Sequence, residues 1–305
     1  MTNLTLKMTG DVSRRPIPLK RQALYVDVAD PGDPDLLFEN AEIVADTHGP
    51  WPALDYLYEF AREPKLPREA WTRRVMVASC IEYLLEDFFY QTPPWEMIGM
   101  FDPERIDEAV RALSSPRGMV AMTFHAGFSV NVIHFFAAFL KDGLMISPTA
   151  RTEFGALSAK DPARTLIAAL RALRDGRSIC IAPDGEVGKP RGTIQLLGAE
   201  CAVNDGAAFL AYESGCDTAL FTMLRNGRLF VPLVVPGPSR AAGETFKAFG
   251  KRLMEFYRDR IEEHFLGDPD NLAISKEWRR RLKAAVRRAA SLPKTDAPTK
   301  RTHQV

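Results

Sequence analysis

One segment of the chain places a histidine where proton transfer could occur. His125 follows an apolar run, and the small residues Ala126 and Gly127 come directly after it. An imidazole titrates near neutral pH, so a histidine at the end of a strand can act as a general base. The small residues leave room for a substrate atom beside the ring. A histidine that only bonds to the backbone of its own loop would give the same pattern, and the sequence leaves both interpretations open.

A second segment concentrates charge and glycine directly after another apolar run. Residues 183–192 hold the carboxylates Asp184 and Glu186 and the cations Lys189 and Arg191. Glycines between them allow backbone N–H groups to approach an anion. The two cations could therefore neutralise a phosphate group. An exposed, charged turn is the alternative interpretation.

Strands and helices that alternate along the chain must position these two segments. Apolar runs predict strands, and amphipathic runs with capping residues predict helices. Uninterrupted apolar strands between helices are typical of a parallel sheet that is covered on both faces. We therefore expect an α/β fold with a mixed, mostly parallel central sheet flanked by helices. The predicted strands are Gly118–Phe124, Gly143–Ser147, Arg177–Ala182, Asp217–Leu224 and Arg228–Val235. The predicted helices are Pro52–Arg62, Thr72–Tyr90, Pro103–Leu113, Ser129–Lys141, Pro162–Leu173, Asp205–Ser214, Gly243–Phe265 and Glu277–Ala290.

Two turns complete this prediction. Asn226-Gly227 between the last two strands is a strong hairpin signal and makes the sheet mixed. Leu197–Gly206 is predicted to be a loop in which Asn204 or Asp205 caps the following helix. Capping alone explains these polar residues, so we assign them no catalytic role.

The overall charge excludes some functions but hides an uneven distribution. Lys and Arg total 40 and Asp and Glu total 39, a formal net charge of +1, which is not typical of a nucleic-acid-binding protein. Residues 22–61 hold nine acids and no Lys or Arg, whereas residues 276–305 hold ten Lys or Arg and two acids, a local +8. We expect an acidic, proline-rich extension (1–70), an α/β domain (71–265) and a basic C-terminal helix and tail (266–305).

The cysteines and the chain start favour a cytoplasmic protein without a metal. The four cysteines form no C-x-x-C pair, so a zinc site is not expected. The first residues lack the apolar run of a secretory signal. The uncharged stretch 118–140 contains His125, Asn131 and His134, so we interpret it as strand, loop and packed helix rather than a membrane span. We expect His134 to be structural.

Taken in order, these motifs resemble the lysophospholipid acyltransferase superfamily, in particular its lipid A late-acyltransferase branch. Three blocks carry the likeness, which covers roughly residues 73–235. The first is a histidine with glycine two residues later, as in His125 and Gly127. The others are Pro183–Gly188 with Arg191–Gly198, and the small-residue segment Asp205–Gly215.

The resemblance implies a soluble acyltransferase. It would move an acyl group from a thioester donor, acyl carrier protein or coenzyme A, to a hydroxyl or amine. His125 would be the base, and the donor's phosphopantetheine or coenzyme A would be the only cofactor-like group. Asp184 and Glu186 complete the predicted catalytic set. The predicted substrate-binding residues are Gly127, Phe128, Asn131, Arg151, Gly185, Lys189 and Arg191.

The sequence departs from the family motif at one position. The family places an acid five residues after its histidine, and here that residue is Val130. The acid orients and charges the histidine, as the third member of a catalytic triad does. Asp184 or Glu186 could replace it, or the reaction could be an easier one, such as attack of an amine on a thioester. The alternative is a non-catalytic member that binds an acyl chain or lipid.

The C-terminal helix and one aromatic cluster have their own predictions. Residues 276–290 place Trp278, Leu282 and Ala285 on one side and basic residues over much of the rest. This pattern is typical of a helix on an anionic surface, either an acidic acyl carrier protein or the inner face of the membrane. The protein would then be cytoplasmic or peripheral to that membrane, or simply a membrane-surface protein. Phe135, Phe136 and Phe139 are expected in the core rather than in an acyl-chain slot.

Overall fold

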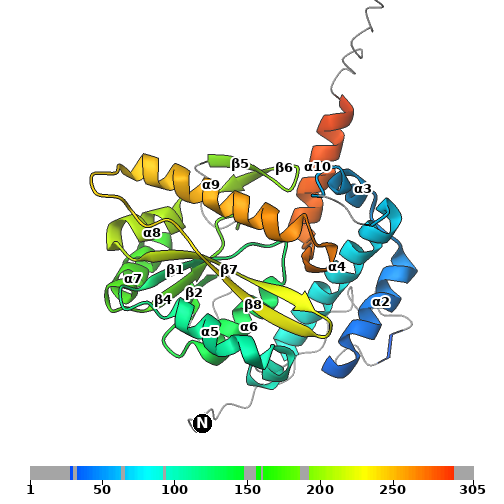
Figure 1. Cartoon of the computed structure of the whole chain (residues 1–305), viewed down its shortest axis with the longest axis horizontal. Helices are drawn as coiled ribbons and strands as arrows, with labels where there is room; N and C mark the ends of the chain where they lie inside the picture. Colours follow the sequence, from blue (N-terminus) through cyan, green and yellow to red (C-terminus); the bar gives the residue numbers. More distant parts are fainter. Residues whose placement is uncertain are drawn as a thin grey trace, which may run out of the picture.

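A mixed, mostly parallel sheet forms the centre of the protein. The computed structural model describes residues 28–29, 33–62, 66–91, 94–147, 156–158, 161–185 and 192–291. The six strands lie in the order β3-β2-β4-β1-β7-β8, and β8 alone is antiparallel to its neighbour. Helices flank the sheet (Figure 1), which confirms the predicted α/β class. The strands are β1 (Met119–Met122), β2 (Leu144–Ser147), β3 (Ala156–Ser158), β4 (Ser178–Ile181), β7 (Asp217–Asn226) and β8 (Leu229–Pro236).

The pairing of β1 with β4 brings the two polar segments together. The strands run parallel, with Met119 opposite Ser178 and Met122 opposite Ile181. Their carboxyl ends therefore reach the same edge of the sheet, where reactive groups collect in such folds. Both strands are buried along their whole length, which explains their uninterrupted apolar sequences. The loops that carry His125 and Asp184 both leave from this edge.

The helices follow the predicted order, with shifted ends. Pro103 and Pro162 begin their helices after Asp102 and Asp161, whose side chains accept from the N–H groups of Glu104 and Arg164. The helix predicted to end at Arg62 stops four residues earlier, and the one predicted from Thr72 already begins at Arg68. The helices are α2 (Leu37–His48), α3 (Pro52–Tyr58), α4 (Arg68–Gln91), α5 (Pro103–Leu113), α6 (Ser129–Phe139), α7 (Pro162–Arg174), α8 (Gly206–Ser214), α9 (Phe246–Phe265) and α10 (Lys276–Ser291). Short 3₁₀ helices are Pro34–Leu36, Pro94–Met100 and Pro269–Asn271.

Two hairpins differ from the sequence prediction. The turn between β7 and β8 centres on Gly227 and Arg228 because Asn226 pairs with Leu229, so Asn226 is still part of the strand. Gly227 has φ +60°, which fits glycine at the first central position of such a turn. The predicted loop from Leu197 is wrong. It is part of a second, two-stranded sheet of β5 (Gly192–Leu196) and β6 (Ala199–Val203).

The missed strand β6 does carry a local signal. Ala199, Cys201 and Val203 are buried while Glu200 and Ala202 are exposed, which is the alternation of a strand with one covered face. At the helix that follows, the side chain of Asn204 accepts from the N–H of Gly206, as the capping prediction allowed.

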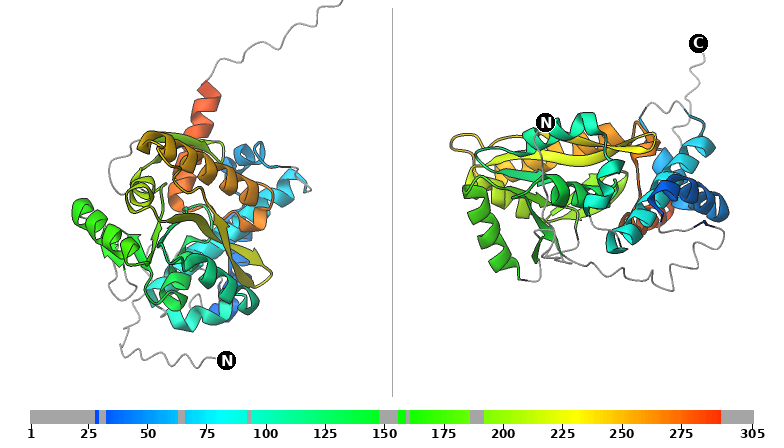
Figure 2. Two further views of the ribbon diagram at one scale, coloured as in Figure 1. Left: turned by 60° about the vertical axis from the view of Figure 1, so that its left-hand side comes forward. Right: turned by 90° about the horizontal axis from the view of Figure 1, so that it is seen from below.

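One hydrophobic core unites the described chain. It includes side chains of α2, α3 and α10 together with those of the central sheet. Figure 2 shows α2, α4 and α10 gathered at one end of the molecule, beside the sheet. The division of the chain at residues 70 and 265 into three parts stays a prediction. The described helices on either side of both positions pack into this shared core.

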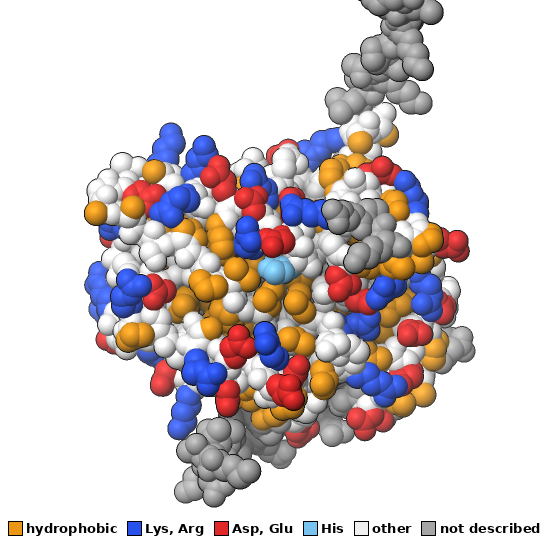
Figure 3. Space-filling model, viewed as in Figure 1, with side chains coloured by type: hydrophobic (Ala, Val, Ile, Leu, Met, Phe, Trp, Pro, Cys, Tyr) orange, Lys and Arg blue, Asp and Glu red, His pale blue; other side chains and the backbone are white. Residues whose placement is uncertain are grey.

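The two sides of α10 differ in exposure, and its apolar side is not available to an external surface. Trp278 and Leu282 are fully buried and Ala285 is 6% exposed, so the apolar side of the helix packs inside the protein and does not face outward. Lys276, Arg280, Lys283 and other basic side chains remain exposed. Figure 3 shows cationic and anionic side chains interspersed over one face of the molecule. Among the helices of the described ranges, none has the length and apolarity required to cross a membrane.

Candidate functional site: a histidine–aspartate pair

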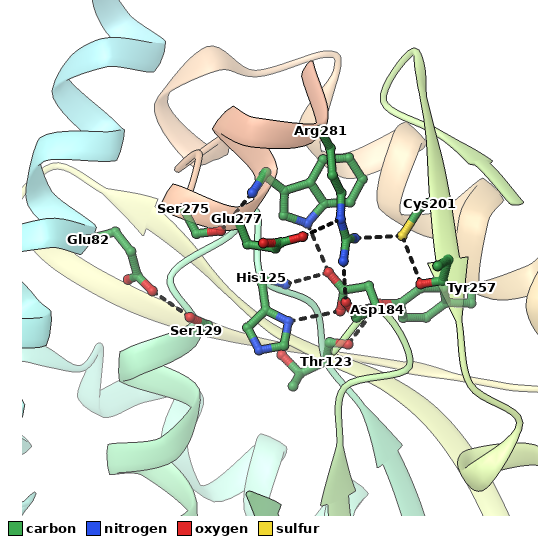
Figure 4. Close-up of polar contacts among 12 residues, drawn as sticks. Glu82, Thr123, His125, Ser129, Asp184, Cys201, Tyr257, Ser275, Glu277 and Arg281 are labelled. Carbon is green, nitrogen blue, oxygen red and sulfur yellow. Dashed lines mark hydrogen bonds and ion pairs between the residues drawn. The ribbon is translucent and has the colours of Figure 1, made fainter. Parts of the chain in front are cut away.

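His125 and Asp184 meet at the edge of the sheet where β1 and β4 end. Nδ1 of His125 lies 3.1 Å from Oδ1 of Asp184, and the backbone N–H of His125 donates to Oδ2 at 3.0 Å. The Asp184 side chain is fully buried, whereas 41% of the His125 side chain is exposed. The carboxylate therefore holds the imidazole from the protein side while part of the ring stays accessible (Figure 4). Nδ1 donates when it carries the proton, which leaves Nε2 as the ring's acceptor.

Two further side chains contact the Asp184 carboxylate. The indole Nε1 of Trp278, on α10, donates to Oδ2 at 2.9 Å. The hydroxyl of Tyr257, on α9, lies 3.3 Å from Oδ1 and donates at 2.8 Å to the carbonyl of Thr123. Both aromatic side chains are fully buried. The carboxylate thus has hydrogen-bonding partners from the β1 end and from both C-terminal helices.

These contacts set the charges of the pair. Burial is the largest influence on Asp184 and by itself raises its pKa, but the charge and N–H groups of His125, with the Trp278 indole, outweigh it and lower the pKa to about 2. Burial is also the largest influence on His125 and lowers its pKa, yet the charge and hydrogen bond of Asp184 raise it overall. Arg281 opposes that rise, and Glu277 supports it. The pair therefore favours an ionised carboxylate beside an imidazole that accepts a proton readily.

Arg281 fixes the backbone that follows β4. Its guanidinium donates to the carbonyl of Asp184 at 2.8 Å, to Sγ of Cys201 at 2.7 Å and to Glu277 at 3.0 Å. Only 12% of the Arg281 side chain is exposed. Arg281 therefore connects α10, the strand β6 and the start of the loop after Asp184. The thiol of Cys201 is held neutral there, because burial raises its pKa to about 12.

The glycines beside the pair are close to other atoms. A Cβ on Gly127 would meet Phe124 at 3.1 Å, Thr222 at 3.2 Å and Phe265 at 3.3 Å. A Cβ on Gly185 would lie 3.5 Å from Cε1 of His125 and 3.2 Å from a carbonyl. The N–H of Gly185 donates to the carbonyl of Ala182, so that amide is already used.

The start of α6 is held by a second buried carboxyl. Oε1 of Glu82, on α4, accepts from the Ser129 hydroxyl at 2.5 Å and from the N–H of Val130 at 3.2 Å. Burial, the largest influence, raises the pKa of Glu82 to about 8; the Ser129 hydroxyl opposes this rise, and the charge of Glu86 supports it. Glu82 is therefore largely neutral at pH 7. It reaches the backbone of Val130, the second residue of α6.

The structure brings together only part of the predicted site. His125, Asp184, Gly127 and Gly185 lie together, as described above. Phe128 and Asn131 are buried, and both amide atoms of Asn131 lack a hydrogen-bond partner among the residues that the structure describes. The predicted residues outside the described ranges are Glu186, Arg151, Lys189 and Arg191.

Sequence reasoning missed Tyr257, Trp278 and Arg281, which contact Asp184, and Glu82, which holds the start of α6. Among the residues that the structure describes, no group of three or more His, Cys, Asp or Glu side chains is arranged to hold a metal ion. His134, which the sequence predicted to be structural, is fully buried on α6.

Comparison with known proteins adds no assignment: no family model matches the chain, and no curated protein matches it.

Proposed function

We propose that the protein is an acyltransferase that uses His125 as a general base. The observation that carries this proposal is the His125–Asp184 pair, in which a buried, ionised carboxylate orients a partly exposed imidazole. A carboxylate on Nδ1 fixes the tautomer that leaves Nε2 free to accept a proton, and it stabilises the imidazolium that forms. The pair also supplies the acid that this chain lacks at Val130. The resemblance of the sequence to lysophospholipid acyltransferases supports the choice of acyl transfer over other base-catalysed reactions.

The proposed reaction conserves atoms and protons at each step. Nε2 of His125 takes the proton of an acceptor hydroxyl or amine while its oxygen or nitrogen attacks the carbonyl carbon of the thioester. The tetrahedral oxyanion is stabilised by backbone N–H groups, for which the small-residue loop at Ala126 and Gly127 is the candidate. The carbon–sulfur bond then breaks, and the imidazolium returns its proton to the leaving thiolate. The products are the acylated acceptor and the free thiol of coenzyme A or of the carrier's phosphopantetheine.

Replacement of His125 by alanine tests this proposal. A positioned general base contributes about 10²–10⁴-fold to such a reaction. We therefore expect His125→Ala to reduce thiol release from a long-chain acyl-coenzyme A, in the presence of a panel of alcohols and amines, by at least about 100-fold. His48→Ala changes an exposed histidine at the end of α2 and serves as the matched control. Equal rates in both folded variants would remove His125 from the mechanism.

The same assay separates catalysis from simple binding. The absence of an acid at position 130 favours a non-catalytic member that binds an acyl chain or lipid. The Asp184 carboxylate beside His125 removes that reason, because it can take the place of the acid. If acyl-coenzyme A binds tightly but no thiol is released with any acceptor, the binding interpretation replaces ours. The proposal also includes acyl carrier protein as a donor and membrane contact through residues 276–290. Because Trp278 and Leu282 are buried, the apolar side of this helix is not available to a membrane, which favours the protein donor.

A further inference from the structure

The C-terminal helix α10 reaches into the site from the far end of the chain. Trp278 lies 94 residues after Asp184 in the sequence, and its indole N–H contacts the same oxygen, Oδ2, as the backbone N–H of His125. Arg281 holds the carbonyl of the same aspartate. Figure 4 shows the Arg281 side chain directed toward Asp184. Nothing in the local sequence of Asp184 requires such contacts.

The geometry points to Trp278 and Arg281 as positioning residues that fix the orientation of the Asp184 carboxylate toward His125. This inference rests on the proposed function for its catalytic consequence, but not for its geometry. A carboxylate can turn about its Cβ–Cγ bond, and Oδ1 faces Nδ1 of His125 only while Oδ2 is held on the other side. Trp278 supplies a rigid neutral donor for Oδ2, and its ring is fully buried, so it cannot move away without opening the core.

Arg281 holds the backbone of Asp184, whereas Trp278 holds its side chain. Its planar guanidinium spans three acceptors: the Asp184 carbonyl, the Cys201 sulfur and a Glu277 oxygen. A planar fork of this kind holds several acceptors in one geometry, which a lysine ammonium does not reproduce. The carbonyl of Asp184 belongs to the peptide bond with Gly185, whose N–H donates to the carbonyl of Ala182, so both sides of this peptide are held. Arg281 thus keeps the whole residue in place, and Trp278 keeps its side chain in place.

Two variants isolate these contributions. Trp278→Phe keeps an aromatic ring but removes the N–H donor. Arg281→Lys keeps the positive charge but loses the fork, and its half-buried charge partner Glu277 lies four residues earlier on the same helix. Lys283→Ala removes an exposed cation from the outer side of the same helix and is the matched control. Asp184→Asn gives the reference for complete loss of the carboxylate charge.

The decisive measurement is the imidazole pKa of His125 in the full-length protein, followed by NMR of the ring carbons, because it needs no substrate. If the two residues position the carboxylate, its effect on the ring weakens in both variants, and the His125 pKa falls toward the Asp184→Asn value. The pKa stays unchanged in Lys283→Ala. A pKa that stays level or rises in Trp278→Phe and Arg281→Lys overturns the inference. If one variant fails to fold, the other decides alone.

A kinetic measurement adds the catalytic consequence. With an acyl-coenzyme A thioester that the enzyme turns over, we expect each variant to lower kcat by about tenfold or more, the factor of one hydrogen bond to a charged group, with KM within about twofold. A change in KM alone would contradict a positioning role. If His125→Ala leaves thiol release intact, the proposed function fails, while the NMR result still decides whether α10 orients Asp184.

Discussion

Replacing Asp184 with asparagine removes one buried charge and changes the shape of the side chain little. Folding lowers the pKa of this carboxyl from 3.8 to about 2. At about 1.36 kcal/mol for each pKa unit, this corresponds to roughly 2–3 kcal/mol of stability. The group is fully buried, so solvent screening does not reduce that value much. We therefore expect Asp184→Asn to lower the free energy of unfolding by about 2–3 kcal/mol where both partners are charged.

The pH dependence of this loss identifies its cause. Because the folded-state pKa of Asp184 is lowered, its contribution is present above pH 3.8 and is lost as the pH falls through about 2. Because the folded-state pKa of His125 is raised from 6.5, its contribution is present below pH 6.5 and is lost as the pH rises through the folded value. Asparagine removes both contributions. The stability difference should thus be largest between about pH 5 and 6 and smaller on either side.

Urea unfolding followed by far-UV circular dichroism, between pH 2.5 and 8, measures this difference. Asp142→Asn changes an exposed aspartate after α6 and should stay within about 0.5 kcal/mol of the unchanged protein at every pH. A loss for Asp184→Asn that is constant across the whole range would mean that asparagine only disturbs packing. A maximum loss below about 1 kcal/mol would mean that the buried pair is not charged. Either result would refute the ion-pair argument for the site.

Two other substitutions test the surroundings of the pair. Glu82→Gln should remove a pH-dependent loss of stability. Folding raises the Glu82 pKa from 4.5 to about 8, so the natural protein loses up to roughly 5 kcal/mol of stability as the pH rises through that interval. The variant should not show this loss, which parallel urea titrations at pH 5 and 8 would measure. Equal slopes for both proteins would argue against a buried neutral carboxyl. Gly127→Ala should cost about 1–3 kcal/mol and disturb the His125 ring signals, because its Cβ would lie 3.1–3.3 Å from three side chains. Gly99→Ala, whose Cβ meets nothing within 4 Å, is its control, and equal thermal melting of the two would contradict the close packing of this loop.

The sequence predicts the sheet edge of this site well and its far wall poorly. His125 and Asp184 each follow a buried strand, and parallel strands end at a common edge, so their meeting is a consequence of strand type once β1 and β4 are neighbours. The sequence could not choose Asp184 over Glu186, since both follow the same strand. That the Asp184 carboxylate turns back toward His125 is a property of the folded loop.

The helical contributions could not be predicted because amphipathic periodicity shows a buried side but not its partner. The sequence predicts Trp278 and Leu282 on one apolar side of α10, but it does not predict that this side packs inside the protein. In the sequence, Arg281 is one cation among many in a basic helix, although only 12% of its side chain is exposed and Lys283 on the same helix is exposed. A buried acid within an apolar helix side, as at Glu82, is a signal that the sequence does contain, because such a residue needs a partner when it is buried.

The two buried carboxyls show why Asp184 can serve the histidine and Glu82 cannot. Both lie near the loop that begins at His125, and both are almost completely excluded from water. Asp184 faces a titrating ring and several N–H or O–H donors, which outweigh the cost of burying its charge. Glu82 accepts from one hydroxyl and one backbone N–H, has no cation beside it among these contacts, and keeps its proton at pH 7. Environments that separate the pKa values of neighbouring acids assign their roles. The charged acid contacts His125, and the neutral one holds the start of α6. His125 therefore has a carboxylate partner although position 130 is a valine.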